Sequence, residues 1–127
     1  MKIALDTASN VNVVKAYEPG EVQIRDKHYR RSLIVLPNWL MNDWVPDSVT
    51  QLRSVHFNPV LEHRPELLIL GTGETQVFPE PATFMTLMDL GIGCEVMDNA
   101  AACRTYNILL SEDRRVALAL ILAGQAS

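Results

Sequence analysis

Short apolar runs separated by turn residues make up the first part of the chain. The stretch VNVVKAYEPGEVQI, residues 11–24, has two such runs on either side of Pro19-Gly20, a dipeptide that favours turns, so it predicts a β-hairpin. The run YRRSLIVLP, residues 29–37, predicts a further strand. Residues 1–11 show little periodicity, and we expect them to form a loose N-terminal arm before a single domain over residues 12–127.

The second half of the chain alternates between strand and helix patterns. Pro81 suits the first turn of a helix and Gly91 the position just after its end. The expected elements are a strand at 67–70, a helix at 81–90, a strand at 94–98, a helix from 99 and a closing strand at 115–123. This order predicts an α/β fold, in which a right-handed crossover makes the strands at 67–70 and 94–98 parallel.

The middle of the chain is less regular. Pro37 and Pro46 interrupt residues 37–49, so we expect a loop there, with Trp39 and Trp44 as its apolar residues. Two interpretations of these tryptophans fit: a lid packed on the core, or a surface that binds a protein partner. Residues 49–65 fit either a strand-like start or a short helix before Pro65.

A basic cluster lies where the first strands meet. It contains Arg25, Lys27, His28, Arg30 and Arg31. Side chains alternate between the two faces of a strand, so the cluster divides between both sides of the ribbon. We expect a solvated turn and strand edge, since exposed charges need no special function.

The glycine loop after residues 67–70 is the first candidate site. It contains Gly71, Thr72 and Gly73, followed by Gln76. Parallel strands place this loop and Asp98 at one carboxyl-terminal sheet edge, where open α/β sheets bind ligands. A dinucleotide fingerprint would need a third glycine at position 76, so that match is weak. A tight turn with positive φ and a backbone cradle for an anion or a partner's carbonyl group both fit.

The helix that begins after Asp98 contains the remaining candidates. Asp98 suits the N-cap position. Arg104 lies among small residues, and we expect its guanidinium to be partly buried against a carboxylate or the carbonyl groups of residues 71–73. Arg104 could also activate the neighbouring Cys103, but no histidine is close in sequence, and a buried helical cysteine is usually a small hydrophobic residue.

Composition narrows the class of protein. With 127 residues, 48% hydrophobic and 20% charged, the chain resembles an ordinary globular domain. A net charge of -4 gives no general attraction for nucleic acid. No apolar run is long enough to span a membrane, and two cysteines without a leader peptide suggest the cytoplasm. We find no metal-ligand spacing, no cofactor motif and no pair of catalytic carboxylates.

Two segments also resemble a known family. The segments are PELLILGTGETQVFPEP and GIGCEVMDNAAACRTYNILLSEDRRVALALI, and the likeness extends from about Asn12 to Ala123. The family consists of small proteins with a domain of unknown function, and includes a mitochondrial assembly factor of NADH:ubiquinone oxidoreductase (respiratory complex I). The resemblance implies a three-layer fold with a mixed sheet of about five strands, an added β layer and no established catalytic activity. Without a mitochondrial presequence, this chain looks like a bacterial member.

Two functions follow as expectations. The first is a non-enzymatic binding or assembly domain with a protein partner. The second is a small-molecule or nucleotide-binding protein, an enzyme included, that uses the sheet-edge cleft. The cleft candidates are Gly71, Thr72, Gly73, Gln76, Asp98 and Arg104, with Tyr106 and Asn107 from the ACRTYN run of the resemblance.

Overall fold

The computed structural model describes residues 11–122, so the expected N-terminal arm lies almost entirely outside the described residues. The strands are β1 Val14–Glu18, β2 Glu21–Ile24, β3 Lys27–Tyr29, β4 Leu33–Leu36, β5 Trp39–Met41, β6 Leu67–Gly71, β7 Gly93–Met97 and β8 Val116–Leu120. The α-helices are α2 Asn58–His63, α3 Met85–Asp89 and α4 Asn99–Ser111, and the 3-10 helices are η1 Val49–Gln51, η2 Ser54–Phe57 and η3 Pro81–Phe84. None of the helices in the described part has the length and apolar character needed to cross a membrane.

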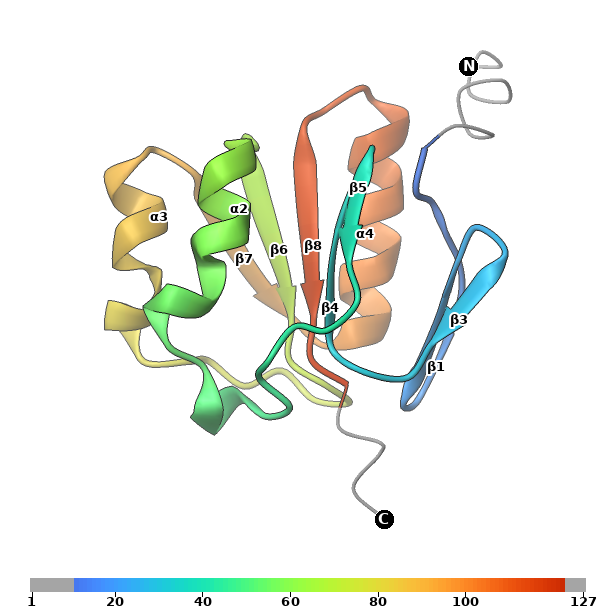
Figure 1. Cartoon of the computed structure of the whole chain (residues 1–127), viewed down its shortest axis with the longest axis horizontal. Coiled ribbons are helices and arrows are strands. Elements are labelled where there is room, and N and C mark those ends of the chain that lie inside the picture. The colour runs from blue at the N-terminus through green and yellow to red at the C-terminus, as the bar shows by residue number, and fades with distance from the viewer. Residues whose placement is uncertain (1–10, 123–127) are drawn as a thin grey trace.

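A five-stranded mixed sheet forms the centre of the molecule (Figure 1). Its order is β5-β4-β8-β6-β7. β6 is parallel to both β7 and β8, whereas β4 is antiparallel to β8 and β5. The predicted α/β fold, the parallel pair and a mixed sheet of about five strands are therefore confirmed.

Both faces of the three inner strands of this sheet, β4, β8 and β6, are largely buried. In β8, Val116, Leu118 and Leu120 belong to one core cluster, while the alternate residues Ala117 and Ala119 belong to the other. All five residues of β8 are buried. This explains why the strand reads as a continuous apolar run, since a strand covered on both faces shows no polar alternation.

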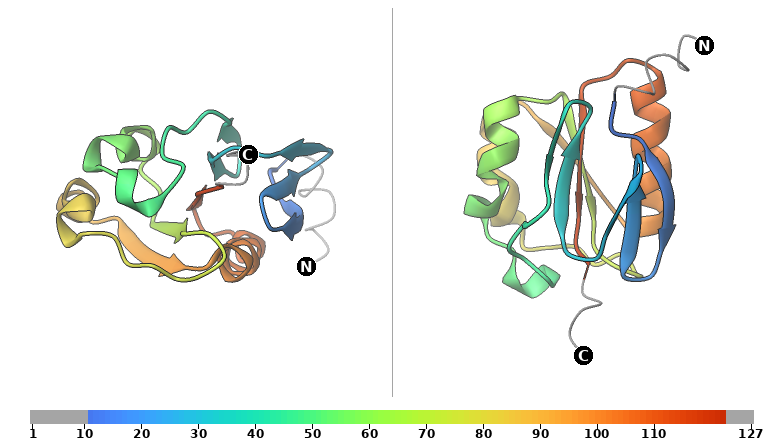
Figure 2. Two further views of the ribbon diagram at one scale, coloured as in Figure 1. Left: turned by 90° about the horizontal axis from the view of Figure 1, so that it is seen from below. Right: turned by 45° about the vertical axis from the view of Figure 1, so that its right-hand side comes forward.

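Different elements cover the two faces (Figure 2). The helices α2 and α3 lie on one side, where Phe57, Val60 and Leu87 join the core. On the other side α4 and a second sheet lie next to each other, and Val22, Ile24 and Tyr106 join the core there. The result is the three-layer arrangement that the resemblance implied.

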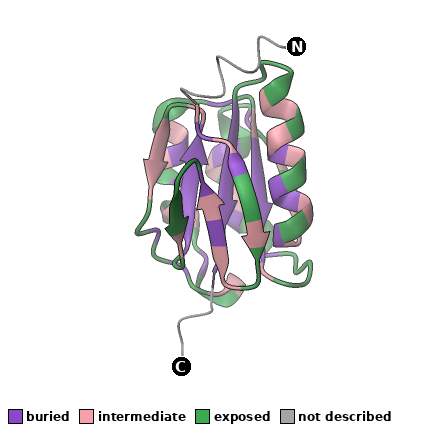
Figure 3. Cartoon of the chain, turned by 90° about the vertical axis from the view of Figure 1, so that its right-hand side faces the viewer, coloured by how far each residue is buried: buried purple, intermediate pink, exposed green. Residues whose placement is uncertain are grey.

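The second sheet contains β1, β2 and β3 in antiparallel order. β1 and β2 form the predicted hairpin around Pro19-Gly20, and Gly20 has a φ of 82°. The added β layer therefore has three strands in place of a simple hairpin. Its outer face carries many exposed residues, whereas the strands of the main sheet behind it are buried (Figure 3).

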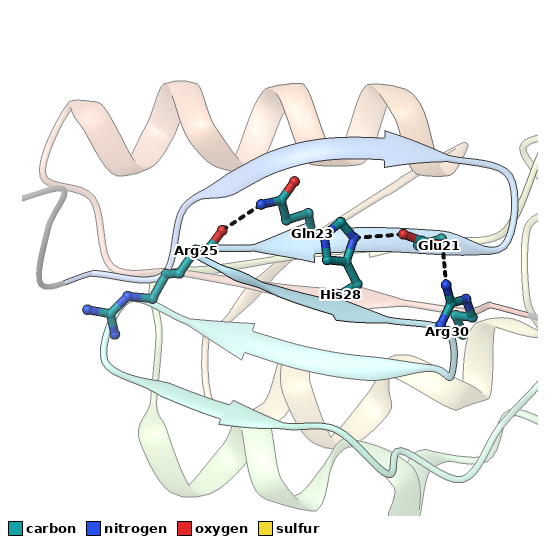
Figure 4. A network of polar contacts seen from close by, with 5 residues as sticks. All are labelled: Glu21, Gln23, Arg25, His28 and Arg30. Atoms are coloured by element: carbon teal, nitrogen blue, oxygen red, sulfur yellow. Dashed lines mark hydrogen bonds and ion pairs between the residues drawn. The ribbon is translucent and has the colours of Figure 1, made fainter.

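The predicted basic cluster lies on this outer sheet and at its ends, and is exposed as expected. A carboxylate oxygen of Glu21 lies 2.7 Å from Nδ1 of His28, and its other oxygen lies 3.2 Å from Arg30 (Figure 4). The amide of Gln23 donates to the backbone oxygen of Arg25 at 3.0 Å. An exposed ion pair such as Arg30–Glu21 contributes about 0–1 kcal/mol, so the network is mainly a solvated surface.

Two strand expectations need correction. The predicted strand over residues 29–37 is divided between β3 and β4, because the chain passes from one sheet to the other at residues 30–32. Ser32 is buried there, and its hydroxyl accepts a hydrogen bond from the backbone N–H of Leu122 at 2.9 Å. The predicted loop 37–49 contains β5, which pairs with β4. In residues 49–65 the short-helix alternative is correct.

Candidate functional site

The glycine loop follows β6 at the carboxyl end of the sheet. The hydroxyl of Thr72 donates to the backbone oxygen of Thr75 at 2.7 Å and accepts from the backbone N–H of Val77 at 3.0 Å. Gly73 has a φ of 111°, a region that favours glycine. The tight turn expected from the sequence is therefore present, and a buried threonine holds its shape.

Asn99 connects this loop to its surroundings. Its side chain is almost fully buried, with 1% exposed. Its Oδ1 accepts from the backbone N–H of Gly73 at 3.0 Å, and its Nδ2 donates to the backbone oxygen of Ile121 at 3.0 Å. The same Nδ2 donates to the hydroxyl of Tyr17 at 3.2 Å. One amide therefore joins β1, the glycine loop and the end of β8.

Gly71 makes this arrangement possible. A Cβ atom at this position would lie 2.3 Å from Oδ1 of Asn99 and 2.6 Å from Cδ2 of Leu120. No real Cβ tolerates such distances, so the glycine allows β6 to approach the first turn of α4 closely. Gly71 is therefore required for packing here.

Asp98 caps α4. Its Oδ1 accepts from the backbone N–H of Ala101 at 2.8 Å, which is the N-cap role expected from the sequence. The backbone N–H of Asn99 also donates to the carbonyl oxygen of Gly73 at 2.8 Å. The glycine loop and the helix start are therefore neighbours at the same sheet edge, as the parallel strands predicted.

Tyr17 and Glu74 form a pair beside Asn99. The hydroxyl of Tyr17 donates to Oε2 of Glu74 at 2.6 Å. Burial, together with the neighbouring Glu74 carboxylate, raises the pKa of Tyr17 well above its ordinary value. The phenol keeps its proton at physiological pH, and acts as a hydrogen-bond donor.

These groups border a hollow of about 590 Å³. Its walls come from the β1–β2 turn, residues 47–50, the glycine loop and the end of β8. Thr72 and Gly73 contribute to it, and so do Tyr17, Glu74 and Asn99. The walls also include the apolar side chains of Val49, Val77 and Ile121, so both apolar and polar groups line the hollow.

The remaining cleft candidates lie elsewhere. Gln76 points to β7, where its Nε2 donates to the backbone oxygen of Val96 at 2.8 Å. Tyr106 is buried, and its hydroxyl donates to the backbone oxygen of Asn12 at 2.7 Å. The amide of Asn107 pairs with both backbone groups of Val14, at 3.0 and 2.8 Å. Tyr106 and Asn107 therefore attach the outer sheet to α4 and do not face the hollow.

The expectation for Arg104 is wrong. The residue is exposed, and within residues 11–122 no ion pair or hydrogen bond of its guanidinium is found. It lies beside β1, at a shallow groove that it shares with Ala100, Cys103 and Asn107. The amide of Asn99 makes the contacts with the glycine loop that we expected from Arg104.

The two tryptophans have different environments. Trp44 is 5% exposed, its indole N–H donates to the backbone oxygen of His56 at 2.8 Å, and its ring lies 5.9 Å from that of Phe57. The packing alternative therefore describes the environment of Trp44, which belongs to the core cluster under α2 and α3. Trp39 in β5 is partly exposed, with its ring 4.4 Å from that of His63. A partner surface at Trp39 stays a prediction.

The thiols are poor nucleophiles in this environment. Burial raises the pKa of Cys94 to about 11 and that of Cys103 to about 12. Arg104 opposes the shift at Cys103, but burial outweighs it. In the described part of the chain, no three His, Cys, Asp or Glu side chains are grouped so that they could hold a metal ion.

Three site residues were not predicted from the sequence: Tyr17, Glu74 and Asn99. The strand-to-helix position of Asn99, directly after the N-cap, is a local signal for a side chain at the sheet edge. Tyr17 had no such signal, because its contact with Asn99 joins residues 82 apart in sequence.

Comparisons with known proteins agree with this fold. The NMR structure of Xanthomonas campestris XCC1710 is 39% identical, with a TM-score of 0.82, covering 91% of this chain and 87% of that one. An assembly factor 3 of the NADH dehydrogenase [ubiquinone] 1 alpha subcomplex from Danio rerio is 33% identical over 118 residues, covering 90% of this chain but 66% of the relative.

A further relative is named as a membrane protein. The 13 kDa major membrane protein of Francisella tularensis is 28% identical over 109 residues, covering 84% of this chain and 88% of the relative. The family described as protein of unknown function (DUF498/DUF598) matches residues 14–121. That match takes in every strand and helix described above, and the chain belongs to the DUF498/DUF598 family.

Proposed function

We propose that this chain is a non-enzymatic protein-binding domain with a role like that of an assembly factor. The name of the Danio rerio relative supports a role in assembly. The chemistry of the site supports a non-enzymatic role, because Thr72, Asp98 and Asn99 use their polar groups to hold the backbone. The proposal includes the cytoplasmic location expected from the sequence. Cell fractionation tests this location.

The observation that carries the proposal is an exposed apolar segment. Of the eight large hydrophobic side chains exposed in the described residues, five come from residues 77–90. They are Val77, Phe78, Met85, Met88 and Leu90, with 41% to 70% of each exposed. Grouped apolar residues on a surface mark interaction sites, and methionine adapts well to partner surfaces. We call this stretch the 77–90 segment.

A pull-down with the full chain tests the proposal. The test variant combines Phe78→Ser and Met88→Ser, and the matched control is Ile108→Ser, which changes an exposed residue of α4. We expect the parent and the control to retain a stoichiometric protein partner that the double variant loses. Circular dichroism shows that all three chains are folded. A partner retained equally by all three would overturn the 77–90 segment as the binding surface.

A second candidate function is the binding of a small molecule in the hollow. The hydrogen-bonded Tyr17 and Glu74 in its walls favour this alternative. A ligand at 100 times its dissociation constant stabilises a fold by about 2.7 kcal/mol, which a thermal-shift screen detects. If nucleotides, flavins and sugar phosphates cause no upward shift, or an equal shift in Tyr17→Phe, the hollow is not their binding site.

A further inference from the structure

β7 forms an edge of the main sheet and pairs with β6 alone among the described strands. The backbone N–H of Gly93 points to β6, where it donates to Glu66, and the backbone oxygen of Met97 accepts from Thr72 on the same side. Alternate residues of a strand direct their backbone groups to opposite sides. The backbone groups of Cys94 and Val96 therefore point away from β6, to the edge of the sheet.

This open edge is incompletely covered. The side chain of Gln76 donates to the backbone oxygen of Val96 at 2.8 Å, and Gln76 is itself exposed. Within residues 11–122, the N–H and carbonyl groups of Cys94 and the N–H of Val96 have no hydrogen-bond partner. A row of unpaired backbone groups is a template for a further strand. An added strand can displace the exposed side chain of Gln76 from the backbone oxygen of Val96.

The two faces beside this edge differ in chemistry. The side chains of Cys94 and Val96 pack towards the core cluster under α2 and α3. Glu95 is exposed on the opposite face. The 77–90 segment is next to the edge at both ends, since Gln76 is bonded to Val96 and Leu90 lies shortly before β7. One face is therefore apolar and the other carries a carboxylate.

The sequence around the edge is acidic throughout. From Pro65 to Cys103 the chain has no Lys, Arg or His, whereas it has six acidic residues: Glu66, Glu74, Glu80, Asp89, Glu95 and Asp98. Folding pairs Glu66 with Arg114 at 2.7 Å, whereas Glu80, Asp89 and Glu95 are exposed and have no salt bridge within residues 11–122. Exposed carboxylates of this kind attract positive charge and repel acidic partners. A segment that pairs with β7 should accordingly be basic.

We infer that β7 binds an extended, basic segment of a protein partner as an additional strand. This inference rests on the proposed function and names the partner's chemistry. Side chains alternate along the added strand, so apolar residues lie on the side of Cys94 and Val96, and Lys or Arg lies on the side of Glu95. Backbone hydrogen bonds to Cys94 and Val96 give affinity, and the alternation gives specificity.

Fluorescence anisotropy with a labelled seven-residue peptide of alternating Lys and Val tests the inference. We expect saturable binding to the full chain. The same peptide with N-methyl groups on the backbone amides that face β7 should bind at least about tenfold more weakly, because two or more hydrogen bonds are lost. Because this comparison changes only the peptide, it tests the added strand even if a variant of the protein does not fold.

Two test variants of the protein, each with a control variant, check whether the peptide pairs with β7. Cys94→Pro removes an outward N–H and breaks no bond to β6, and should abolish binding, whereas Cys94→Ala should retain it. Glu95→Arg should weaken binding by roughly threefold to tenfold and improve binding of a Glu-Val peptide, since exposed charge pairs contribute modestly. Glu18→Arg, in the outer sheet, is the matched control and should change binding less than about twofold.

Equal binding of the methylated peptide, or no binding of the Lys-Val peptide, would overturn the inference. Dimerisation of the free chain that Cys94→Pro abolishes, seen by sedimentation, would instead assign the edge to a second copy and also overturn it. The proposed function fails separately: if Phe78→Ser with Met88→Ser loses the cellular partner and Cys94→Pro retains it, the proposed function stands and the added strand does not.

Discussion

Asn99→Ala should be the most destabilising polar-to-alanine change at the sheet edge. The substitution removes three hydrogen bonds, to Gly73, Ile121 and Tyr17. The hydroxyl of Tyr17 keeps its bond to Glu74, so the groups left without a partner are the N–H of Gly73 and the carbonyl of Ile121. A buried group without a partner costs about 1–3 kcal/mol, so the pair costs about 2–6 kcal/mol. We expect about 3 kcal/mol, because the N–H of Gly73 is only partly buried.

Urea denaturation measures this loss. With a slope of about 1.5 kcal/mol per molar, a loss of 3 kcal/mol lowers the midpoint by about 2 M. Asn58→Ala is the control, because Asn58 is exposed and surface changes usually alter the unfolding free energy by less than about 0.5 kcal/mol. A loss below about 1 kcal/mol for Asn99→Ala, with an unchanged slope, would refute the view that this amide holds the loop.

Three further predictions concern single residues. Arg104→Ala should change the unfolding free energy by less than about 0.5 kcal/mol in urea, because the side chain is exposed; a loss above 2 kcal/mol would contradict this. Gly71→Ala should cost about 1–3 kcal/mol in the same assay, since its methyl group overlaps Asn99. Burial, with Arg53 nearby, lowers the pKa of His56 below its usual value. Unfolding free energy should therefore fall as pH drops through about 6.5, and this slope should be smaller in His56→Asn; equal slopes would contradict it.

The sequence predicted the elements whose patterns are local. The apolar run of β8, the glycine after β6 and the N-cap before α4 each depend on neighbouring residues, and each has its expected form. From the strand order alone, Gly73 and Asp98 were placed at one edge. Local patterns thus predicted the second half of the fold and part of the candidate site.

Other features depend on contacts between distant residues, which no local pattern reports. The run 29–37 was interpreted as one strand because Tyr29 and the apolar residues 33–36 favour strands, but they belong to two strands of different sheets. The small residues around Arg104 showed that α4 packs closely, not which side of the helix meets β1. Likewise, Tyr17 reaches Asn99 only because the outer sheet packs next to α4.

The position of β8 has a consequence for protein synthesis. β8 is the last described strand in the chain, yet it is the middle strand of the main sheet, between β4 and β6. While the chain is being made, β4 and β6 have no shared neighbour, and their apolar residues lack the strand that completes both core clusters. A chain stopped at residue 115 should show no cooperative thermal transition by circular dichroism. A nascent chain of this protein therefore exposes two apolar strand edges until the ribosome has released Val116–Leu120, and that interval is when chaperones protect it best from aggregation.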